Sequence, residues 1–172
     1  IEGGSRRRLI LSKHDTVTRP TSLHGDVVEM VFTEACDTPK LAWRARTVRD
    51  NFEAFDLMRE SPKPSIVICM GDEGIASRVL AKKFGAFGTF ASLESGKATA
   101  SGQVTLAEMR DLYRWNSITA RTRVFGLIGD PVAHSLSPLV HNASFSSLGV
   151  DAVYLPFRVA PGYESFKAFM VE

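Results

Sequence analysis

Short runs of branched and aromatic residues alternate along this chain with longer stretches in which apolar residues recur every three or four positions. The short runs predict strands near Arg8–Ser12, Thr38–Trp43, Ser65–Met70 and Gly88–Leu93. The longer stretches predict helices, because positions at this spacing share one helical face. The predicted faces are Val27, Val28, Val31 and Phe32; Val48, Phe52, Phe55 and Met58; Ile75, Val79, Leu80 and Phe84; and Leu106, Met109, Leu112 and Tyr113. Such alternation is typical of β-α units with parallel strands.

The pattern is interrupted once, by the polar stretch Asn116–Ala120. A new strand is predicted at Arg123–Gly129, and helix, strand and helix follow it. We therefore expect two α/β parts, residues 1–118 and 119–172. The four β-α units of the first part correspond to half of an eight-unit barrel, and an isolated half has two unpaired sheet edges. The remainder of the barrel is thus expected from outside this sequence, and the helical pattern at Val171–Glu172 indicates that the second part also continues.

The composition is that of a folded, core-forming protein, with 44% hydrophobic and 23% charged residues. The 21 Lys and Arg residues nearly balance the 19 Asp and Glu residues, and apart from Arg6–Arg8 the basic residues are scattered. This charge pattern is too weak for a nucleic-acid-binding surface. No stretch approaches the roughly 20 apolar residues that span a bilayer. We therefore expect neither nucleic acid nor a membrane as a partner.

The two cysteines, Cys36 and Cys69, do not occur in a spacing typical of metal ligands. We expect neither a metal site nor a disulfide framework, which favours a reducing compartment. The first residues lack the apolar core of a signal peptide. The protein is expected in the cytoplasm, or in a plastid where a transit peptide precedes this sequence.

Two ionisable residues stand at the ends of predicted strands. His14 comes just after an apolar strand, and Lys40 lies at the start of the next one. In parallel barrels, the residues that do chemistry lie at strand ends or point inward along the strands. A lysine in an apolar strand is costly unless it is paired or neutral, and desolvation lowers its pKa toward that of a nucleophilic amine. Lys40 is therefore a candidate nucleophile. The alternative is a lysine at a strand entrance whose ammonium reaches water.

Four segments of the first part occur in the order and spacing of the type I 3-dehydroquinate dehydratases. They are Ile10–Asp15, Thr38–Ala42, Gly74–Arg78 and Gly96–Gln103. Residues 8 to 115 resemble this family, and four motifs in register make the resemblance specific. It implies that this part is the C-terminal half of a (β/α)8 TIM barrel and that it dehydrates 3-dehydroquinate to 3-dehydroshikimate without a cofactor.

The resemblance implies three roles in the reaction. Lys40 would form an iminium with the C3 ketone of 3-dehydroquinate and so make the C2 proton acidic. His14 would remove that proton and then protonate the departing C1 hydroxyl, since the pKa of histidine lies near neutrality. Arg78 would hold the substrate carboxylate by a bidentate ion pair. Taken alone, His14 would be interpreted as a capping or surface residue and Arg78 as a solvated helix residue.

Three further residues match the family's substrate contacts. Thr99 and Gln103 match the loop that closes over the substrate, and Met70 matches an apolar contact that lines the pocket. The family usually has Ser at the position of Thr99, so the hydroxyl is retained.

A different alignment would place the run Val27–Met30 on the lysine strand and replace the nucleophile by Glu29. The register with Lys40 is preferred because it keeps the motif Asp37–Lys40, the segment Ala45–Thr47 and the following helix together.

The second part contains the run Phe125–Asn142, which follows a predicted strand and opens a helix. Pro138 fits the first helical turn, and Ser137 is the predicted N-cap. Because Ser135 and Ser137 alternate, both hydroxyls can face one anion near the positive helix terminus. A helix start after a glycine-bearing turn is the plainer interpretation. The run lacks the spacing of a dinucleotide-binding fingerprint.

Residues 123 to about 170 resemble the N-terminal substrate-binding domain of the shikimate dehydrogenases. This resemblance implies that Ser135 and Ser137 bind the carboxylate of shikimate. The family's catalytic Lys and Asp and its NADP domain have no counterpart here. NADP is therefore expected as a cofactor of the complete dehydrogenase, and no cofactor-binding residue is expected in this chain.

Together, the two resemblances indicate a bifunctional enzyme that makes 3-dehydroshikimate and reduces it to shikimate with NADPH. Its expected partners are these small molecules and the remainder of the barrel, and this chain alone is expected to be inactive. The alternative function is a non-catalytic ligand sensor like the quinate repressors, and a gene remnant is a third interpretation. His14 and Lys40 favour the enzyme, because a sensor needs no Schiff-base nucleophile.

Overall fold

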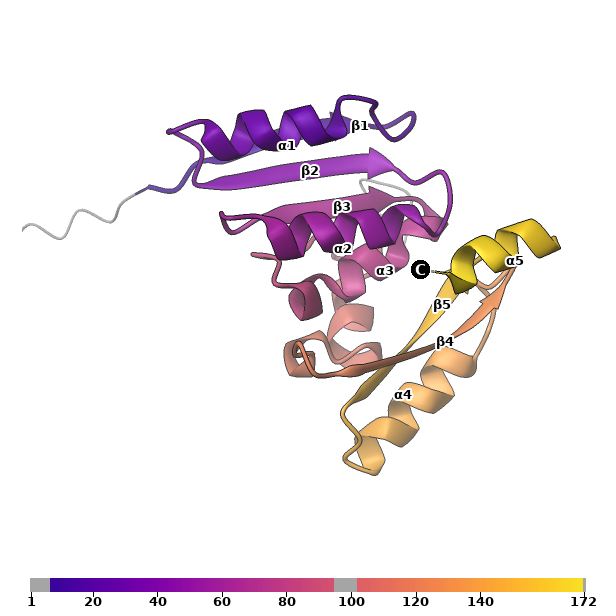
Figure 1. Cartoon of the computed structure of the whole chain (residues 1–172). Coiled ribbons are helices and arrows are strands. Elements are labelled where there is room, and N and C mark those ends of the chain that lie inside the picture. Colours follow the sequence, from indigo (N-terminus) through magenta and orange to yellow (C-terminus); the bar gives the residue numbers. More distant parts are fainter. Residues whose placement is uncertain (1–6, 95–101, 172) are drawn as a thin grey trace, which may run out of the picture.

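The chain folds into two parallel sheets, seen in a computed structural model that describes residues 7–94 and 102–171 (Figure 1). The first sheet has the order β1-β2-β3, and the second pairs β4 with β5. The strands are β1 (Ile10–Asp15), β2 (Thr38–Arg44), β3 (Ile66–Met70), β4 (Arg123–Gly129) and β5 (Ala152–Arg158). All pairings are parallel, as the alternation of strands and helices predicts. Strand β1 begins two residues later than predicted and extends to Asp15.

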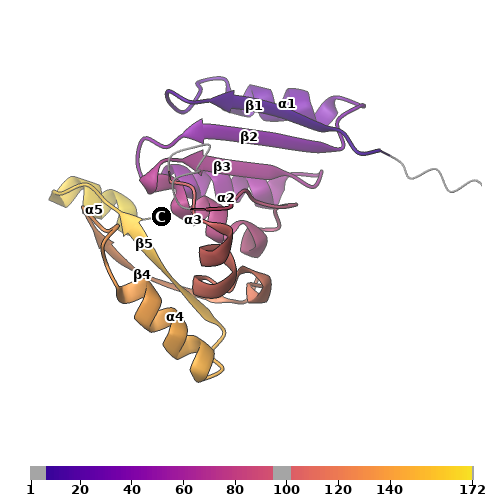
Figure 2. The same cartoon turned by 180° about the vertical axis from the view of Figure 1, so that it is seen from behind.

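The α-helices of the first part are α1 (Leu23–Phe32), α2 (Asp50–Glu60) and α3 (Ile75–Val79), and the short 3-10 helices η1 (Asp72–Gly74) and η2 (Ala81–Phe84) flank α3. Figures 1 and 2 show α1 and α2 on one face of the first sheet. The core between sheet and helices contains Leu41, Trp43, Val67 and Cys69 from the strands and Met30, Phe55, Met58 and Val79 from the helices. The strands and the apolar helix faces therefore contribute residues to one shared core. None of the described helices has the length and apolar character needed to cross a bilayer.

The predicted strand at Gly88–Leu93 is wrong, because among the described residues this segment forms only one isolated bridge, between Ser92 and Thr105. It begins beside β3, where the Phe87 amide donates to the Ser65 carbonyl at 2.7 Å. The segment then leaves the sheet, and Ser92 bonds to the backbone of Val104 and Leu106 instead. An apolar run forms a strand only where a neighbouring strand pairs with it.

The helix predicted around Leu106–Tyr113 forms in part, as a short π-helix η3 (Glu108–Leu112). Met109 and Tyr113 are buried as predicted, whereas Leu106 is exposed. A second short helix, η4 (Trp115–Ser117), precedes the second sheet.

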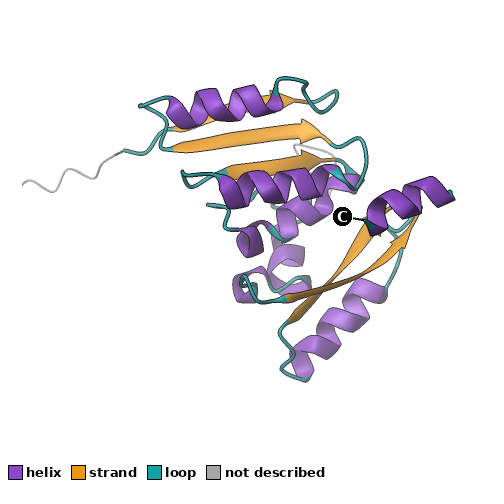
Figure 3. Cartoon of the chain, viewed as in Figure 1, coloured by secondary structure: helices purple, strands orange, loops and turns teal. Residues whose placement is uncertain are grey.

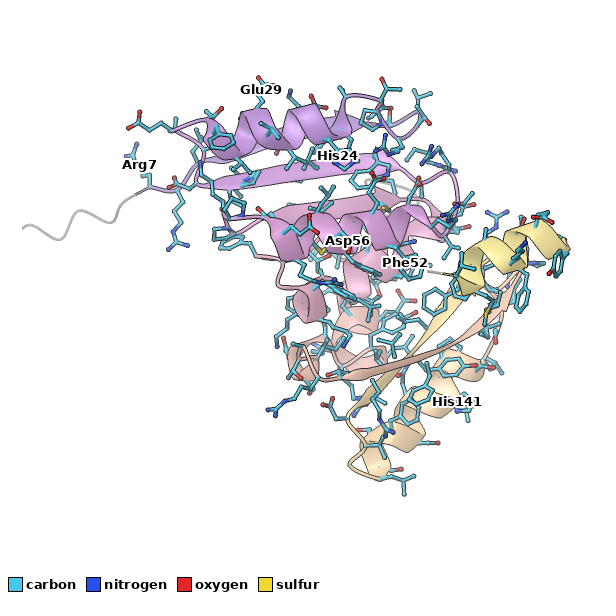
Figure 4. All side chains as sticks on the ribbon, in the orientation of Figure 1. Arg7, His24, Glu29, Phe52, Asp56 and His141 are labelled. Atoms are coloured by element: carbon cyan, nitrogen blue, oxygen red, sulfur yellow. The ribbon has the colours of Figure 1, made fainter. Side chains whose placement is uncertain are left out.

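The second part contains α4 (Ser137–Ser147) and α5 (Tyr163–Met170) (Figure 3). The buried Asn142 fastens α4 to β5, because its amide donates to the Tyr154 carbonyl at 2.9 Å and accepts from the Tyr154 amide at 2.8 Å. His141, labelled in Figure 4, stacks on the Tyr154 ring at 4.4 Å between centroids. These contacts fix where the N-terminus of α4 lies.

The two parts share one hydrophobic core. Ile118, within the segment expected to be a polar joint, is only 2% exposed and belongs to the same core as Val79, Val153 and Leu155. Lys83 binds across the junction, since its ammonium donates to the carbonyls of Ala120 and Thr122 at 2.8 and 2.9 Å. The second sheet is thus packed directly onto the first part.

Candidate active site

The face of the first sheet opposite α1 and α2 carries both candidate catalytic residues. In the register of β1 and β2, Ser12 pairs with Lys40 and His14 pairs with Ala42. Positions two apart on a strand point to one face, so His14 and Lys40 share this face. Lys40 is the third residue of β2 and His14 the fifth of β1, so both lie within strands. The sequence placed Lys40 at the start of a strand and His14 just beyond the end of one, and both predicted positions are corrected.

The Lys40 ammonium has no hydrogen-bond or ion-pair partner within residues 7–94 and 102–171. Its Nζ atom lies 4.2 Å from the centroid of the Phe90 ring. Desolvation, with a smaller contribution from the charge of Arg78, lowers the pKa of Lys40 below its ordinary value of 10.5. A lysine in this environment has a larger fraction of neutral amine, which is the nucleophilic form.

His14 is exposed on the same face. Desolvation and then the charge of Lys40 lower the pKa of His14 below its ordinary value of 6.5. The imidazole is therefore mainly neutral at pH 7 and able to accept a proton.

Arg78 is the most deeply buried charged group of the site, at 2% exposure on α3. Its Nη1 donates to the Phe90 carbonyl at 3.3 Å, and its Nε has no hydrogen-bond partner within residues 7–94 and 102–171. Burial lowers the pKa of Arg78 to about 10. Among the described residues, no carboxylate pairs with this guanidinium. A buried cation of this kind is stabilised by an anionic ligand, and its burial excludes the interpretation as a solvated helix residue.

Two buried polar residues, which the sequence did not single out, hold α3 in place. Ser77 Oγ accepts from the Cys69 amide at 2.9 Å and donates to the Gly74 carbonyl at 2.8 Å. Asn51 Oδ1 accepts from the Ser77 amide at 2.9 Å, and its Nδ2 donates to the Glu73 carbonyl at 2.7 Å. Ser77 precedes Arg78, so this network orients the guanidinium. In the sequence, Asn51 is a polar residue on the apolar side of α2, and this is the signal that could have identified the network.

The remaining predicted contacts of the first part have different outcomes. Met70 is 9% exposed and forms a small apolar cluster with Ala42, Ile66 and Ile68, all on the face of Lys40 by the strand register. Gln103 is described and half-buried, whereas Thr99 lies outside the described residues.

The segment that carries Gln103 passes close to the end of β3. Gly102 has a φ of 67°, and a Cβ atom on it would lie 2.0 Å from the Gly71 carbonyl oxygen. Only glycine fits this contact without displacing the backbone, so the packing brings Gln103 close to the turn after β3.

The alternative register, in which Glu29 would take the place of the nucleophile and the site would be inactive, is excluded. Glu29 lies on α1, labelled in Figure 4, and accepts a hydrogen bond from Lys13 at 2.6 Å. Lys13 is next to His14 on β1 and points to the opposite face.

The serine pair of the second part lies where α4 begins. Ser137 is the first helical residue and Leu136 the N-cap, so the prediction of Ser137 as the N-cap is wrong. Ser135 Oγ instead accepts from the Ser137 amide at 3.2 Å. Pro138 occupies the first turn as predicted. Both serines are half-buried.

The chemistry available at these sites is that of an amine, an imidazole, a guanidinium and two hydroxyls. In the part of the chain that the structure describes, no three His, Cys, Asp or Glu side chains gather as metal ligands would.

Comparison with known families bears directly on this arrangement. The family described as type I 3-dehydroquinase matches residues 2–120, which is more than half of the chain. The chain belongs to the type I 3-dehydroquinase family. The shikimate dehydrogenase substrate binding domain matches residues 127–172.

Similar proteins carry the names of both families. The bifunctional 3-dehydroquinate dehydratase/shikimate dehydrogenase of Arabidopsis thaliana is 38% identical over 154 residues, covering 88% of this chain and 25% of that protein. A shikimate dehydrogenase (NADP(+)) of Geobacter sp. (strain M21) is 64% identical over 45 residues, covering 26% of this chain and 16% of that protein. The crystal structure of the 3-dehydroquinate dehydratase from Aquifex aeolicus VF5 is 32% identical, with a TM-score of 0.52 over 63% of this chain and 50% of that one. This chain thus spans about a quarter of the length of the bifunctional relative.

Proposed function

We propose that this chain is a segment of a bifunctional shikimate-pathway enzyme. Residues 1–118 supply half of a (β/α)8 barrel for the dehydration of 3-dehydroquinate, and residues 119–172 begin the substrate-binding domain of a shikimate dehydrogenase. The family matches in one chain support this proposal, as does the bifunctional Arabidopsis relative. The observation that carries it is Lys40, an unpaired lysine of lowered pKa electrostatically coupled to both His14 and Arg78.

The dehydration follows from the chemistry of these groups. The neutral amine of Lys40 adds to the C3 ketone of 3-dehydroquinate, and water leaves as the iminium forms. His14 takes the proton from C2, and the electrons of that bond move into the iminium. The C1 hydroxyl then departs as water with the proton that His14 returns. Hydrolysis of the iminium releases 3-dehydroshikimate and restores Lys40.

The other contacts orient the substrate. Arg78 binds the carboxylate, which provides the counter-charge that the buried guanidinium otherwise lacks. Met70 contributes an apolar wall on the face of Lys40. Gln103 and Thr99 are assigned to the loop that covers the substrate.

In the second part, Ser135 and Ser137 bind the carboxylate of shikimate or 3-dehydroshikimate at the start of α4. Ser135 Oγ accepts a hydrogen bond from the Ser137 amide. A hydroxyl that accepts in this way keeps its own proton for donation to an anion. In the complete dehydrogenase, NADPH would supply the hydride and would be bound by residues outside this chain. The partners of this chain are then its small-molecule substrates and the rest of the barrel.

The name of the Arabidopsis relative includes the word chloroplastic. We place this enzyme in the cytoplasm, or in the plastid when a transit peptide precedes it.

The decisive experiment traps the iminium. The complete bifunctional enzyme is incubated with 3-dehydroquinate and borohydride, which reduces an iminium to a stable secondary amine, and the labelled lysine is located by mass spectrometry. Lys40→Met should abolish labelling and dehydration. Lys13→Met is the matched control, because Lys13 lies on the neighbouring strand and points to the opposite face.

Each outcome separates the candidate functions. Labelling at Lys40 that is lost only in the Lys40 variant supports the enzyme. Binding of 3-dehydroquinate with neither adduct nor product supports the ligand sensor. Labelling at Lys13 or Lys97 contradicts the assignment of the nucleophile.

The serine pair has a separate test. Replacing Ser135 and Ser137 together by Ala should raise the dissociation constant of shikimate at least tenfold, because each lost hydrogen bond to a carboxylate is worth roughly 1.5 to 3 kcal/mol. Ser147→Ala, near the other end of α4, is the control. Unchanged shikimate affinity in calorimetry would refute the carboxylate role.

A further inference from the structure

Arg158, the last residue of β5, binds the first part of the chain. Its Nε donates to Asp130 Oδ1 at 2.9 Å, within the second part. Its Nη1 donates to Glu73 Oε1 at 3.0 Å and lies 3.8 Å from Asp72 Oδ2, both in the turn after β3. A hollow of about 150 Å³ beside this cluster is lined by Glu73, Asp130 and Arg158. Figures 1 and 2 show the end of β5 beside the end of β3.

The turn that Arg158 contacts, Gly71–Gly74, leads directly into α3 and Arg78. It is tightly packed on β3, because a Cβ atom on Gly74 would lie 2.2 Å from the Cys69 carbonyl oxygen. Asn51 holds the turn from inside through the Glu73 carbonyl. A displacement of this turn therefore changes the position of α3.

The same turn supports the segment of Gln103. The Gly71 carbonyl is the group against which Gly102 packs. The turn thus lies between Arg158 on one side and two assigned substrate contacts, Arg78 and Gln103, on the other.

The charges of the cluster explain what Arg158 does. Arg158 lies between the carboxylates of Asp72 and Glu73 in the first part and that of Asp130 in the second, and its positive charge offsets the repulsion between these like charges. The side chains of Arg158, Glu73 and Asp130 are 37%, 18% and 24% exposed. Ion pairs this accessible to water add little to global stability, so their main effect is on the relative position of the elements they join.

We propose that Arg158, contributed by the dehydrogenase part, is a positioning residue of the dehydratase site: it holds the turn Gly71–Gly74 so that Arg78 meets the substrate carboxylate. This inference rests on the proposed function. Lys40 and His14 lie on β2 and β1, away from the turn. Loss of Arg158 therefore weakens substrate binding and leaves the bond-making steps largely intact.

The test in the complete bifunctional enzyme is the dehydratase kinetics of Arg158→Met. KM should rise roughly three- to tenfold with kcat nearly unchanged, the pattern of a lost binding contact. Arg123→Met, at the other end of the second sheet, is the control and should leave both constants unchanged. The charge-reversed pair Arg158→Glu with Glu73→Arg should restore KM, while Arg158→Glu alone should raise it further.

A second measurement, also on the complete bifunctional enzyme, is independent of catalysis. Amide hydrogen exchange of residues 71–78 should be faster in Arg158→Met than in the unmodified chain, with the exchange of α2 unchanged. If trapping at Lys40 fails, the proposed function fails, and this measurement still decides whether Arg158 holds the turn.

An unchanged KM in Arg158→Met would overturn the inference, whether or not kcat or thermal stability falls. Unchanged exchange of residues 71–78 would exclude the mechanical link itself.

Discussion

Two lysines on neighbouring strands of the first sheet have opposite environments. Lys13 on β1 points to the face covered by α1, where its Nζ lies 2.9 Å from Asp26 Oδ1 and 2.6 Å from Glu29 Oε2. Its hydrogen bonds to Glu29 and Asp26 raise the pKa of Lys13 above 10.5. Lys40 on β2 points to the other face, contacts the Phe90 ring and has its pKa lowered.

The comparison shows that the two faces of one sheet place their lysines in different environments, one that stabilises the charged ammonium and one that favours the neutral amine. Strand alternation assigns each lysine to a face, and α1 supplies carboxylates on only one of them. A lysine that has carboxylate partners is a charged anchor. A lysine without such partners has a more readily available amine, and the neighbouring cation Arg78 strengthens the effect.

The largest effect should come from His14. His14→Ala should slow elimination by roughly 10² to 10⁴-fold, the usual consequence of losing a general acid-base. Iminium formation needs only the amine, so borohydride should still label Lys40. Single-turnover kinetics in the complete enzyme measure both steps. Loss of labelling together with turnover would mean that His14 is needed to form the iminium.

The next effect concerns stability. Burial lowers the pKa of Arg78 from its ordinary value to about 10, which corresponds to a penalty of about 3 kcal/mol on the charged form at pH 7. Arg78→Met removes this penalty and one hydrogen bond worth about 1 kcal/mol, so we expect a net stabilisation of about 1–2 kcal/mol together with loss of substrate binding. Urea unfolding of the 172-residue chain measures it. A clear destabilisation would contradict this balance and show that the contacts of the buried side chain contribute more than its desolvation costs.

Competitive labelling of the two lysines tests the comparison itself. The neutral amine reacts with acetic anhydride, so the pH midpoint of labelling reports the pKa of each lysine. Lys40 should titrate below 10.5 and Lys13 above it. Mass spectrometry of the peptides after labelling from pH 7 to 12 gives both curves. The reverse order would remove the distinction between the two faces.

The smallest effect is expected for Lys13→Met. The folded-state pKa of Lys13 is raised, so the stability that it contributes is fully present below pH 10.5 and is lost as the pH rises through the folded value. Hydrogen bonding to Lys13 lowers the pKa of Asp26 below 3.8, so on the acid side the contribution is lost only as the pH falls through that lower value. Thermal unfolding should show a small difference from the unmodified chain between about pH 4 and 10, and this difference should shrink as the pH rises above 10.5. A difference that does not shrink would point to packing of the lysine stem.

Much of the first sheet follows from local pattern. The apolar runs at residues 38–43 and 65–70 coincide with β2 and β3 within one residue. The apolar period identifies α1 and α2, because burying one face of each helix builds the core. The motif order also singled out Lys40, His14 and Arg78, which the structure couples electrostatically.

The failures share one physical cause. Residues 88–93 have the composition of a strand, yet a strand forms only where a neighbour pairs with its backbone, and here Val104 and Leu106 take that place for Ser92. The N-cap was misplaced for a related reason. Ser135 and Ser137 are equally good capping residues, and the path of the chain decides which oxygen meets the amide.

The sequence by itself determined the parallel β-α architecture, the two family resemblances and the residue types of both sites, because these depend on local periodicity and short motifs. The tertiary structure alone decided which face each lysine occupies relative to α1, the burial of Arg78 and the contact of Arg158 with Glu73. Arg158 and Glu73 are 85 positions apart in the sequence. Their contact is set by how two sheets pack over a shared core, and no periodicity within a single segment encodes that geometry.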